Sequence, residues 1–215
     1  MLVVVSRERA EAREVDRVLA MVDAGVARVH LRRPGLDAAG RLADLLRFPP
    51  HCWPRLSVHG GLPEGAPAST RVVGGHLRGA DRGVAGVAPG APLSASVHSA
   101  AELAARAALP LAYVLASPVA PSLSKAGYAP TLPARDLLAS LRAASRGRGV
   151  RIVALGGVTA DNARDLGAIG FDGVAAIGAV WDAGDPVAAA LAIAAEFAAG
   201  DGARSDALAS GPPRG

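Results

Sequence analysis

The stretch RIVALGGVTADNARDLGAIGFDGVAAIGAV, residues 151–180, contains two apolar runs that each end at glycine. The first run, Ile152–Leu155, leads into the pair Gly156–Gly157, and the second, Val174–Ile177, leads into Gly178. A segment with helical spacing of its apolar residues lies between the two runs. This order of strand, glycine, helix, strand and glycine predicts a βαβ unit whose strands are buried in a parallel sheet.

The glycines of this unit follow the carboxyl ends of the two expected strands. Backbone N–H groups can close around an anion at such positions because no Cβ intervenes. In a (β/α)8 barrel the loops after the last two strands form the usual phosphate-binding corner. Tight turns are the alternative role for the glycines, but two glycine exits one βα unit apart favour a phosphate site.

Six further short apolar runs precede this unit, and helix-forming segments follow most of them. The runs cover residues 2–5, 28–31, 56–58, 72–77, 94–97 and 111–115. The clearest helix is expected over residues 7–24, whereas Gly and Pro after the third and fourth runs predict irregular or short helices. We therefore predict an α/β fold, a TIM barrel over residues 1–199, followed by a disordered tail over residues 200–215.

A doubly wound parallel sheet is the alternative fold for such a succession of strands and helices. That fold needs a glycine-rich fingerprint after its first strand, and Ser6-Arg7-Glu8 stands there instead. The sequence shows neither an internal repeat nor a domain boundary. A single barrel domain is therefore the favoured prediction.

Composition limits the classes of function. The formal net charge is +4, but the arginines are scattered and no aromatic platform accompanies them, which argues against nucleic-acid binding. A mild positive balance equally suits phosphorylated small molecules. The single cysteine, Cys52, excludes an intrachain disulfide and fits a cytoplasmic protein. No leader and no apolar run of membrane-spanning length stands in the sequence, so no membrane association is expected.

Lys125 is the only lysine among 23 basic residues. Its retention in a chain that otherwise uses arginine suggests a need for a compact ammonium group at that position. Chance survival of a surface lysine explains the observation equally well. Lys125 lies in a long, polar segment after the sixth expected strand, where an active-site loop of a barrel would be.

A barrel would gather polar side chains and glycines from the strand ends on one rim. This set comprises Arg32, Arg33, His59, Arg78, Asp81, His98, Ser117, Ser122, Ser124, Lys125, Gly156, Gly157 and Gly178. Such a set can hold two phosphate-bearing groups at once and can stabilise a leaving phosphate or pyrophosphate. His30 and His76 are expected to pack inside the barrel, and His51 is expected on the surface.

Five segments together give the chain a resemblance to the thiamine phosphate synthase family, which includes the related thiazole tautomerases. The segments are HLRRPG (30–35), GGHLRGAD (74–81), SASVHSAAE (94–102), ASPVAPSLSK (116–125) and ALGGVTADN with GFDGVAAIGAV (154–180). They follow the order found in that family and are spread over most of the chain. The resemblance implies a TIM barrel, in agreement with the eight expected strands.

The resemblance also implies a reaction and roles for particular residues. The synthases join hydroxymethylpyrimidine pyrophosphate to hydroxyethylthiazole phosphate, with magnesium assistance and release of pyrophosphate. By this resemblance Arg32 binds pyrophosphate, Lys125 stabilises the leaving group, and Asp81 is one of two magnesium carboxylates. The substrate-binding positions that we assign are Arg33, His59, Ser117, Ser122, Ser124, Gly156, Gly157, Ile177 and Gly178.

The sequence departs from the family pattern at three positions. His59-Gly60 replaces Asn-Asp, so the second magnesium carboxylate is missing, and magnesium binding should weaken. Pro34 replaces a lysine, although Arg33 can supply charge nearby. Pro118 stands where the tautomerases carry a catalytic histidine, which leaves His98 as the obvious general base on the rim.

Three functions are consistent with these residues. The first is a thiamine phosphate synthase-like transferase with Arg32, Lys125 and His98 as catalytic residues and Mg²⁺ as cofactor. The second is a thiazole tautomerase-like isomerase that uses His98 or His59. The third is a non-catalytic binder of thiazole phosphate. Each would be a cytoplasmic protein acting on phosphorylated small molecules, with a homo-oligomer as an open possibility.

Overall fold

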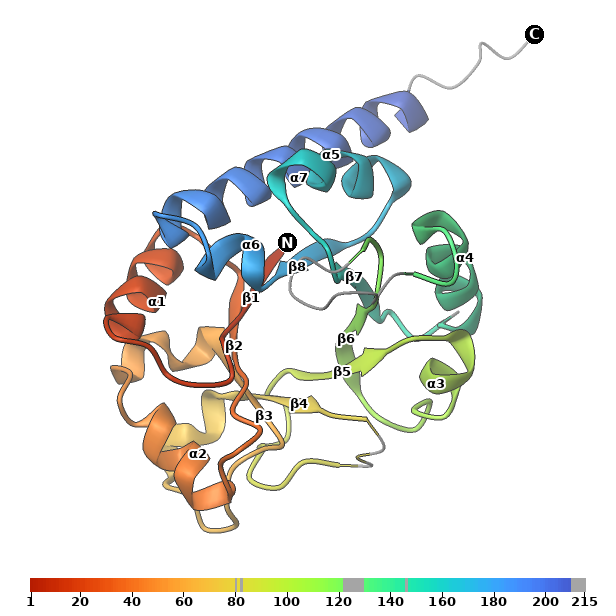
Figure 1. Cartoon of the computed structure of the whole chain (residues 1–215). Coiled ribbons are helices and arrows are strands. Elements are labelled where there is room, and N and C mark those ends of the chain that lie inside the picture. The colour runs from red at the N-terminus through yellow and green to blue at the C-terminus, as the bar shows by residue number, and fades with distance from the viewer. Residues whose placement is uncertain (80, 82, 122–129, 146, 210–215) are drawn as a thin grey trace, which may run out of the picture.

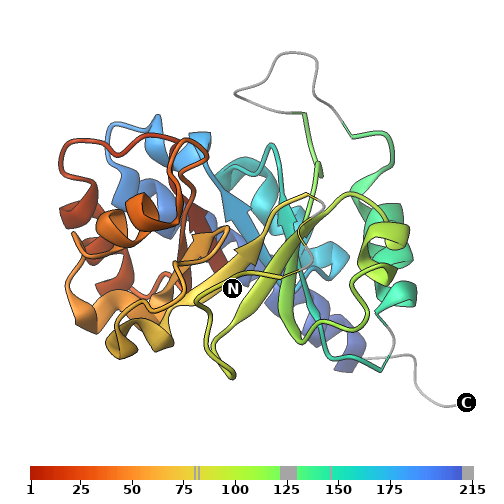
Figure 2. The same cartoon turned by 90° about the horizontal axis from the view of Figure 1, so that it is seen from below.

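The protein is described here by a computed structural model that covers residues 1–79, 81, 83–121, 130–145 and 147–209 of the chain. Its eight strands are all parallel and pair in sequence order to form a closed barrel, in which β1 also pairs with β8. Helices surround this barrel on the outside, and Figures 1 and 2 show it along its axis and from the side. The predicted TIM barrel is therefore confirmed.

The strands are short, with four to six residues each. They are β1 Leu2–Val5, β2 Arg28–Leu31, β3 Leu56–His59, β4 Gly74–Leu77, β5 Leu93–Val97, β6 Leu111–Ala116, β7 Arg151–Leu155 and β8 Gly173–Ala176. The helices are α1 Glu14–Asp23, α2 Ala38–Leu45, α3 Ala100–Ala104, α4 Ala134–Ala144, α5 Ala160–Ile169, α6 Gly178–Trp181 and α7 Pro186–Ala209. Two 3-10 segments, η1 Pro50–Arg55 and η2 Ala68–Val72, precede β3 and β4.

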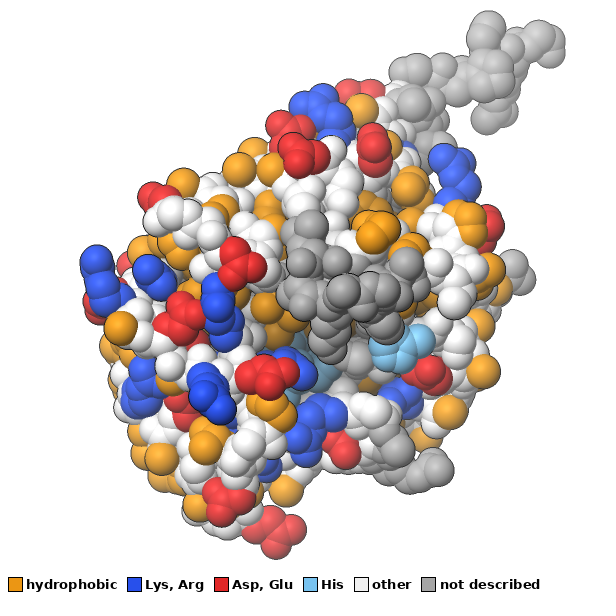
Figure 3. Space-filling view, viewed as in Figure 1, with side chains coloured by type: hydrophobic (Ala, Val, Ile, Leu, Met, Phe, Trp, Pro, Cys, Tyr) orange, Lys and Arg blue, Asp and Glu red, His pale blue; other side chains and the backbone are white. Residues whose placement is uncertain are grey.

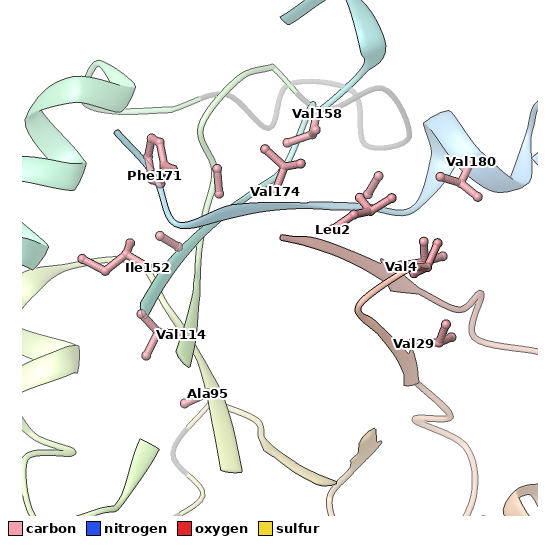
Figure 4. Close-up of a cluster of buried hydrophobic side chains, with 14 of the residues drawn as sticks. Leu2, Val4, Val29, Ala95, Val114, Ile152, Val158, Phe171, Val174 and Val180 are labelled. Carbon is pink, nitrogen blue, oxygen red and sulfur yellow. The ribbon is translucent and has the colours of Figure 1, made fainter. Parts of the chain in front are cut away.

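The main hydrophobic core lies between the strands and the surrounding helices. Alternate strand residues point outward into this layer, as Leu2 and Val4 of β1 do (Figure 4). Phe171 and Ile152 extend the same layer near β7 and β8. This layer is built mainly from Val, Leu and Ala, as the low aromatic content of the sequence predicts.

The interior of the barrel is divided into an apolar half and a polar half. The apolar half comes from β1, β6, β7 and β8, and its buried residues are Val3, Val5, Tyr113, Leu115, Val153 and Ala175. The polar half comes from β2, β3, β4 and β5, and its buried residues include His30, Ser57, His59, His76 and Ser94. Every strand thus contributes inward-facing residues, but only four of them contribute histidine or serine.

The helices after β3 and β4 are reduced, as predicted. A single 3-10 segment, η2, stands where the third helix would be, and the described residues between β4 and β5 form no helix. At the amino end, α1 begins at Glu14 and not at Arg7, because Arg13 adopts a left-handed conformation with φ 60° just before it. Residues 7–13 therefore form a loop after β1 that reaches the carboxyl end of the barrel.

The expected end of the folded domain at residue 199 was wrong. We expected a disordered tail from residue 200, but α7 continues to Ala209. Gly200, the first residue of the expected tail, permits close packing of α7 against α5. A Cβ at Gly200 would lie 1.9 Å from the carbonyl oxygen of Arg164. Figure 1 shows α7 lying across α5. The expected tail residues 210–215 lie outside the described part of the chain.

One helical stretch among the described residues, Pro186–Asp206 of α7, is long and apolar enough to cross a membrane by length and composition alone. No apolar run of that length was expected from the sequence. This stretch packs along α5 and also contacts α1 and α6. A single helix of this kind is weak support for a membrane span, because helices of soluble proteins pass the same test.

Candidate active site

A cavity of about 660 Å³ opens at the carboxyl end of the barrel. All eight strands or the loops that follow them contribute to its wall. The polar residues and glycines among these are Ser6, Arg7, Glu8, Arg32, His59, His76, Arg78, Gly79, Ser96, His98, Ser117, Gly156, Gly157 and Gly178. Figure 3 shows this end of the molecule, with histidine side chains near its middle and arginines and carboxylates around them.

Arg32 extends from the end of β2 into this cavity, as predicted. Its backbone N–H donates to Ser6 Oγ over 2.9 Å, which ties the β2 loop to the end of β1. Its guanidinium donates to a carboxylate oxygen of Glu8 over 2.7 Å and is about one-third exposed. An anionic substrate can therefore reach Arg32, in competition with or beside Glu8.

Arg33 is not a rim residue, and its assignment to substrate binding was wrong. The side chain is 3% exposed and points away from the cavity, toward α1 and α2. It donates to Glu14 over 2.6 Å and forms an ion pair with Asp44 over 3.0 Å. Because neighbouring residues of an extended chain point to opposite sides, Arg32 faces the cavity while Arg33 faces the helices.

Three histidines meet in the polar half of the barrel. His30 Nδ1 lies 3.0 Å from His59 Nε2, and the other nitrogen of His30 is hydrogen-bonded to the Tyr113 hydroxyl. The His59 and His76 rings stack with their centroids 4.0 Å apart. His30 and His76 do pack inside the barrel, as expected, but His59 and His76 also line the cavity. His51 is exposed, as predicted.

Burial keeps these three imidazoles neutral. Desolvation lowers the pKa of His30 and His59 well below the ordinary value for histidine, and the neighbouring histidines lower both further. The pKa of His76 falls to about 3, mainly through desolvation and then through the charge of Arg106. A neutral imidazole has one N–H donor and one nitrogen lone pair, so each ring can still accept a proton or bind a metal.

His98 stands at the exit of β5 with a defined orientation. Its Nδ1 lies 2.7 Å from the carbonyl oxygen of Ser117, and its backbone N–H donates to Glu102 over 3.1 Å. Since a carbonyl oxygen can only accept, Nδ1 carries the hydrogen and Nε2 is left as the basic nitrogen. Ser117 and His98 both line the cavity, as does Ile177.

The glycine corner consists of Gly156 and Gly157 after β7 and Gly178 after β8, whereas Arg32 follows β2, which β1 separates from β8. Gly156 and Gly157 adopt left-handed conformations, with φ 93° and 69°. A Cβ at Gly157 would lie 2.4 Å from the carbonyl oxygen of Pro121, so the residue is needed for close packing as well as for its turn. Gly178 begins α6, where the first amides of a helix have no acceptor within it. Both proposed roles of the glycines, turn and anion cradle, are compatible with this geometry.

Asp81 does not face the central cavity. Its carboxylate accepts from the backbone N–H of Arg78 over 3.0 Å, and it lines a neighbouring groove with His98, Glu102 and Arg106. A magnesium ion prefers several oxygen ligands, and His59-Gly60 supplies no carboxylate nearby. The described residues around Asp81 therefore do not fit the magnesium site that the family resemblance implies.

Ser122, Ser124 and Lys125 lie outside the described residues, so their assigned roles remain predictions. The structure adds Glu8, Arg7 and Ser96 to the cavity wall, none of which the sequence singled out. Glu8 and Arg7 were missed because their segment has helical spacing. Ser96 could have been found, because it stands at the same face of β5 as Ser94, two residues away.

A parallel eight-stranded barrel with a polar cavity at its carboxyl end is typical of TIM-barrel enzymes. Enzymes of this fold bind their substrates at this end, and glycine loops after the last two strands favour phosphorylated ones. The comparisons with known proteins narrow that class.

The sequence profile of the family described as thiamine monophosphate synthase matches residues 69–180, just over half of the chain. A thiamine-phosphate synthase of Salinispora arenicola is 35% identical over 167 residues, covering 74% of each chain. One of Albidiferax ferrireducens is 32% identical over 184 residues, covering 82% of this chain and 81% of the relative. The chain therefore belongs to the thiamine monophosphate synthase family of enzymes, which confirms the resemblance inferred from its motifs.

Solved structures agree on the fold. Thiamine phosphate pyrophosphorylase from Pyrococcus furiosus superposes with a TM-score of 0.67 at 22% identity, covering 92% of this chain and 95% of that one. The enzyme of the same name from Bacteroides thetaiotaomicron gives a TM-score of 0.60 at 22% identity, covering 95% and 97%. Identities this low support the shared barrel architecture alone.

Proposed function

We propose that this enzyme joins hydroxymethylpyrimidine pyrophosphate to hydroxyethylthiazole phosphate and releases pyrophosphate. The observation that carries this proposal is that Arg32, after β2, and the glycine corner, after β7 and β8, line one cavity. A cavity of about 660 Å³ is in the range of ordinary small-molecule sites, and its wall offers Arg32 to one phosphorylated group and the glycine amides to the other.

In this reaction the C–O bond to the pyrophosphate breaks and the leaving group takes the electron pair. The thiazole nitrogen then forms a C–N bond to the exposed methylene carbon. Arg32 would hold the departing pyrophosphate by charge-assisted hydrogen bonds, and Lys125 would assist it from its loop. The amides of Gly157 and Gly178 would hold the thiazole phosphate, so that both substrates are oriented before the bond forms.

Magnesium is the cofactor that this family implies, but we assign it no step. Of the two carboxylates that the family pattern implies, the chain keeps Asp81, which accepts from Arg78 and lies outside the central cavity. The carboxylate in the cavity wall, Glu8, is paired with Arg32. Arginine charge around the cavity would carry the stabilisation of pyrophosphate instead. Arg7, Arg32 and Arg78 all line it.

The test is a coupling assay on the purified full-length chain with both precursors. Product formation is followed by mass spectrometry of thiamine phosphate and by release of pyrophosphate. We expect Arg32→Gln to lower kcat/KM by about 100-fold or more, the scale of losing one preorganised charged donor. Arg71→Gln is the matched control, because Arg71 is an exposed arginine of η2 and does not line the cavity. Absence of product from folded protein would refute the proposal.

An isomerase acting on the thiazole phosphate is the second candidate, and the orientation of His98 favours it. Its Nε2 is the basic nitrogen because Nδ1 is held by the Ser117 carbonyl. Isomerisation of the thiazole carboxylate phosphate that disappears in His98→Gln would support this function. A cytoplasmic location and action on phosphorylated small molecules are proposed for either activity.

A further inference from the structure

Among the described residues, His30, His59 and His76 form the one group whose histidine and carboxylate atoms could surround a single metal ion. One ring nitrogen of each lies within 4.8 Å of those of the other two. His30 Nδ1 and His59 Nε2, at 3.0 Å, are close to the separation of about 3.3 Å that two nitrogens have on a tetrahedral zinc ion. The rings come from three neighbouring strands, β2, β3 and β4, so the barrel fixes their positions.

The surroundings of the three rings resemble those of bound metal ligands. Metal-binding histidines generally donate their second ring N–H to a fixed oxygen, which sets the tautomer and the ring orientation. The second nitrogen of His30 is hydrogen-bonded to the Tyr113 hydroxyl. His76 lies 2.9 Å from both Ser94 Oγ and Ser96 Oγ, so one serine bond can remain when its other nitrogen turns to an ion.

The cluster is closed on one side and open on the other. His30 is fully buried beneath the other two rings, whereas His59 and His76 line the cavity. Three protein ligands with one position open to a cavity is the pattern of a catalytic metal site, and a site closed by four ligands is the structural pattern. Arg32 and Arg78 stand near His59, and their positive charge favours an anion as the fourth ligand.

We propose that His30, His59 and His76 bind one divalent ion of the zinc type at the floor of the cavity, with the fourth position open to an anionic ligand. Imidazole nitrogen suits zinc, copper, iron and nickel, whereas magnesium requires oxygen ligands. Relative to the family pattern Asn-Asp, this chain has His59-Gly60. It therefore lacks one magnesium carboxylate and has an added imidazole at the adjacent position. This inference does not rest on the proposed coupling reaction.

The test uses untagged, chelator-treated full-length protein and Co²⁺ as a spectroscopic substitute for Zn²⁺. We expect one equivalent of Co²⁺ to give the intense visible absorption of a tetrahedral site, and one equivalent of Zn²⁺ to abolish it. Added azide should shift the bands, because it enters the open position. A spectrum of hexahydrated cobalt alone from the folded wild-type protein would overturn the proposal.

Metal binding by substituted proteins tests whether these three histidines are the ligands. His30→Gln and His59→Asn should each weaken Zn²⁺ binding, measured by calorimetry, about 100-fold or more. Tyr113→Phe should weaken it about 10-fold, because it removes the hydrogen bond that orients His30. His51→Gln, which replaces an exposed histidine outside the cluster, should bind like the wild type. Zn²⁺ should raise the Tm of the wild-type protein but not that of the two ligand variants. Equal binding by both ligand variants would place the metal elsewhere and refute the assignment.

Discussion

The two halves of the barrel interior differ in chemistry although they share one fold. The half from β1, β6, β7 and β8 is filled by Val, Leu, Ala and the ring of Tyr113, and the glycine corner lies above it. The half from β2 to β5 contains three histidines with serines beside them. The family profile begins at residue 69, so β1, β2 and β3 precede the matched region. His30, Pro34 and His59 lie there, whereas Gly156, Gly157 and Gly178 lie within the matched region.

The largest effect is expected from the helices behind the polar half. Arg33→Ala should destabilise the protein by about 3 kcal/mol, because it leaves the buried carboxylates of Glu14 and Asp44 with the partly exposed Arg47 in place of their buried partner. Both carboxylates are less than a tenth exposed. Urea unfolding followed by circular dichroism measures the change. A loss below 1 kcal/mol would show that this ion-pair network does not hold α1 and α2 in place.

A smaller loss of stability is expected from a substitution in the glycine corner. Gly157→Ala should destabilise the protein by about 1–3 kcal/mol, because the residue has φ 69° and its new Cβ would meet the Pro121 carbonyl. Thermal unfolding measures the loss. Gly184→Ala is the matched control, because a Cβ there meets no atom within 4 Å. Equal stability of the two variants would contradict the close packing at Gly157.

The polar half should make the metal-free protein sensitive to acid. The folded-state pKa of His76 is about 3, below the unfolded value of 6.5, so the unfolded chain binds more protons between these values. Stability should therefore be fully present above pH 6.5 and fall as pH drops toward 3, by about 1.4 kcal/mol per pH unit for each such histidine. His76→Asn should flatten this slope in urea titrations at several pH values. An unchanged slope would show that the ring is already charged in the folded protein.

The sequence predicted the barrel because short, mostly apolar runs alternate with helix-forming segments, and because glycines follow the last two runs. It also predicted that Arg32, His59, His98 and the glycines share one rim. The histidine cluster was not predicted, since His30 and His76 look like ordinary core residues until strand register and barrel closure bring them to His59. Periodicity alone also failed at Arg33 and at Gly200, where the direction of a side chain and the close contact of two helices decide the outcome.

In the proposed function, Arg32 and the glycine corner bind different phosphorylated groups within one cavity. Calorimetry of wild type, Arg32→Gln and Gly178→Val with inorganic pyrophosphate and with hydroxyethylthiazole phosphate tests it most directly. We expect Arg32→Gln to weaken pyrophosphate binding about 10-fold or more and to leave binding of the thiazole phosphate unchanged. Gly178→Val should weaken binding of the thiazole phosphate to a similar extent and leave pyrophosphate binding unchanged. Each loss is that of one charge-assisted hydrogen bond. Equal losses for both ligands in either variant, or no binding by the folded wild type, would contradict the claim.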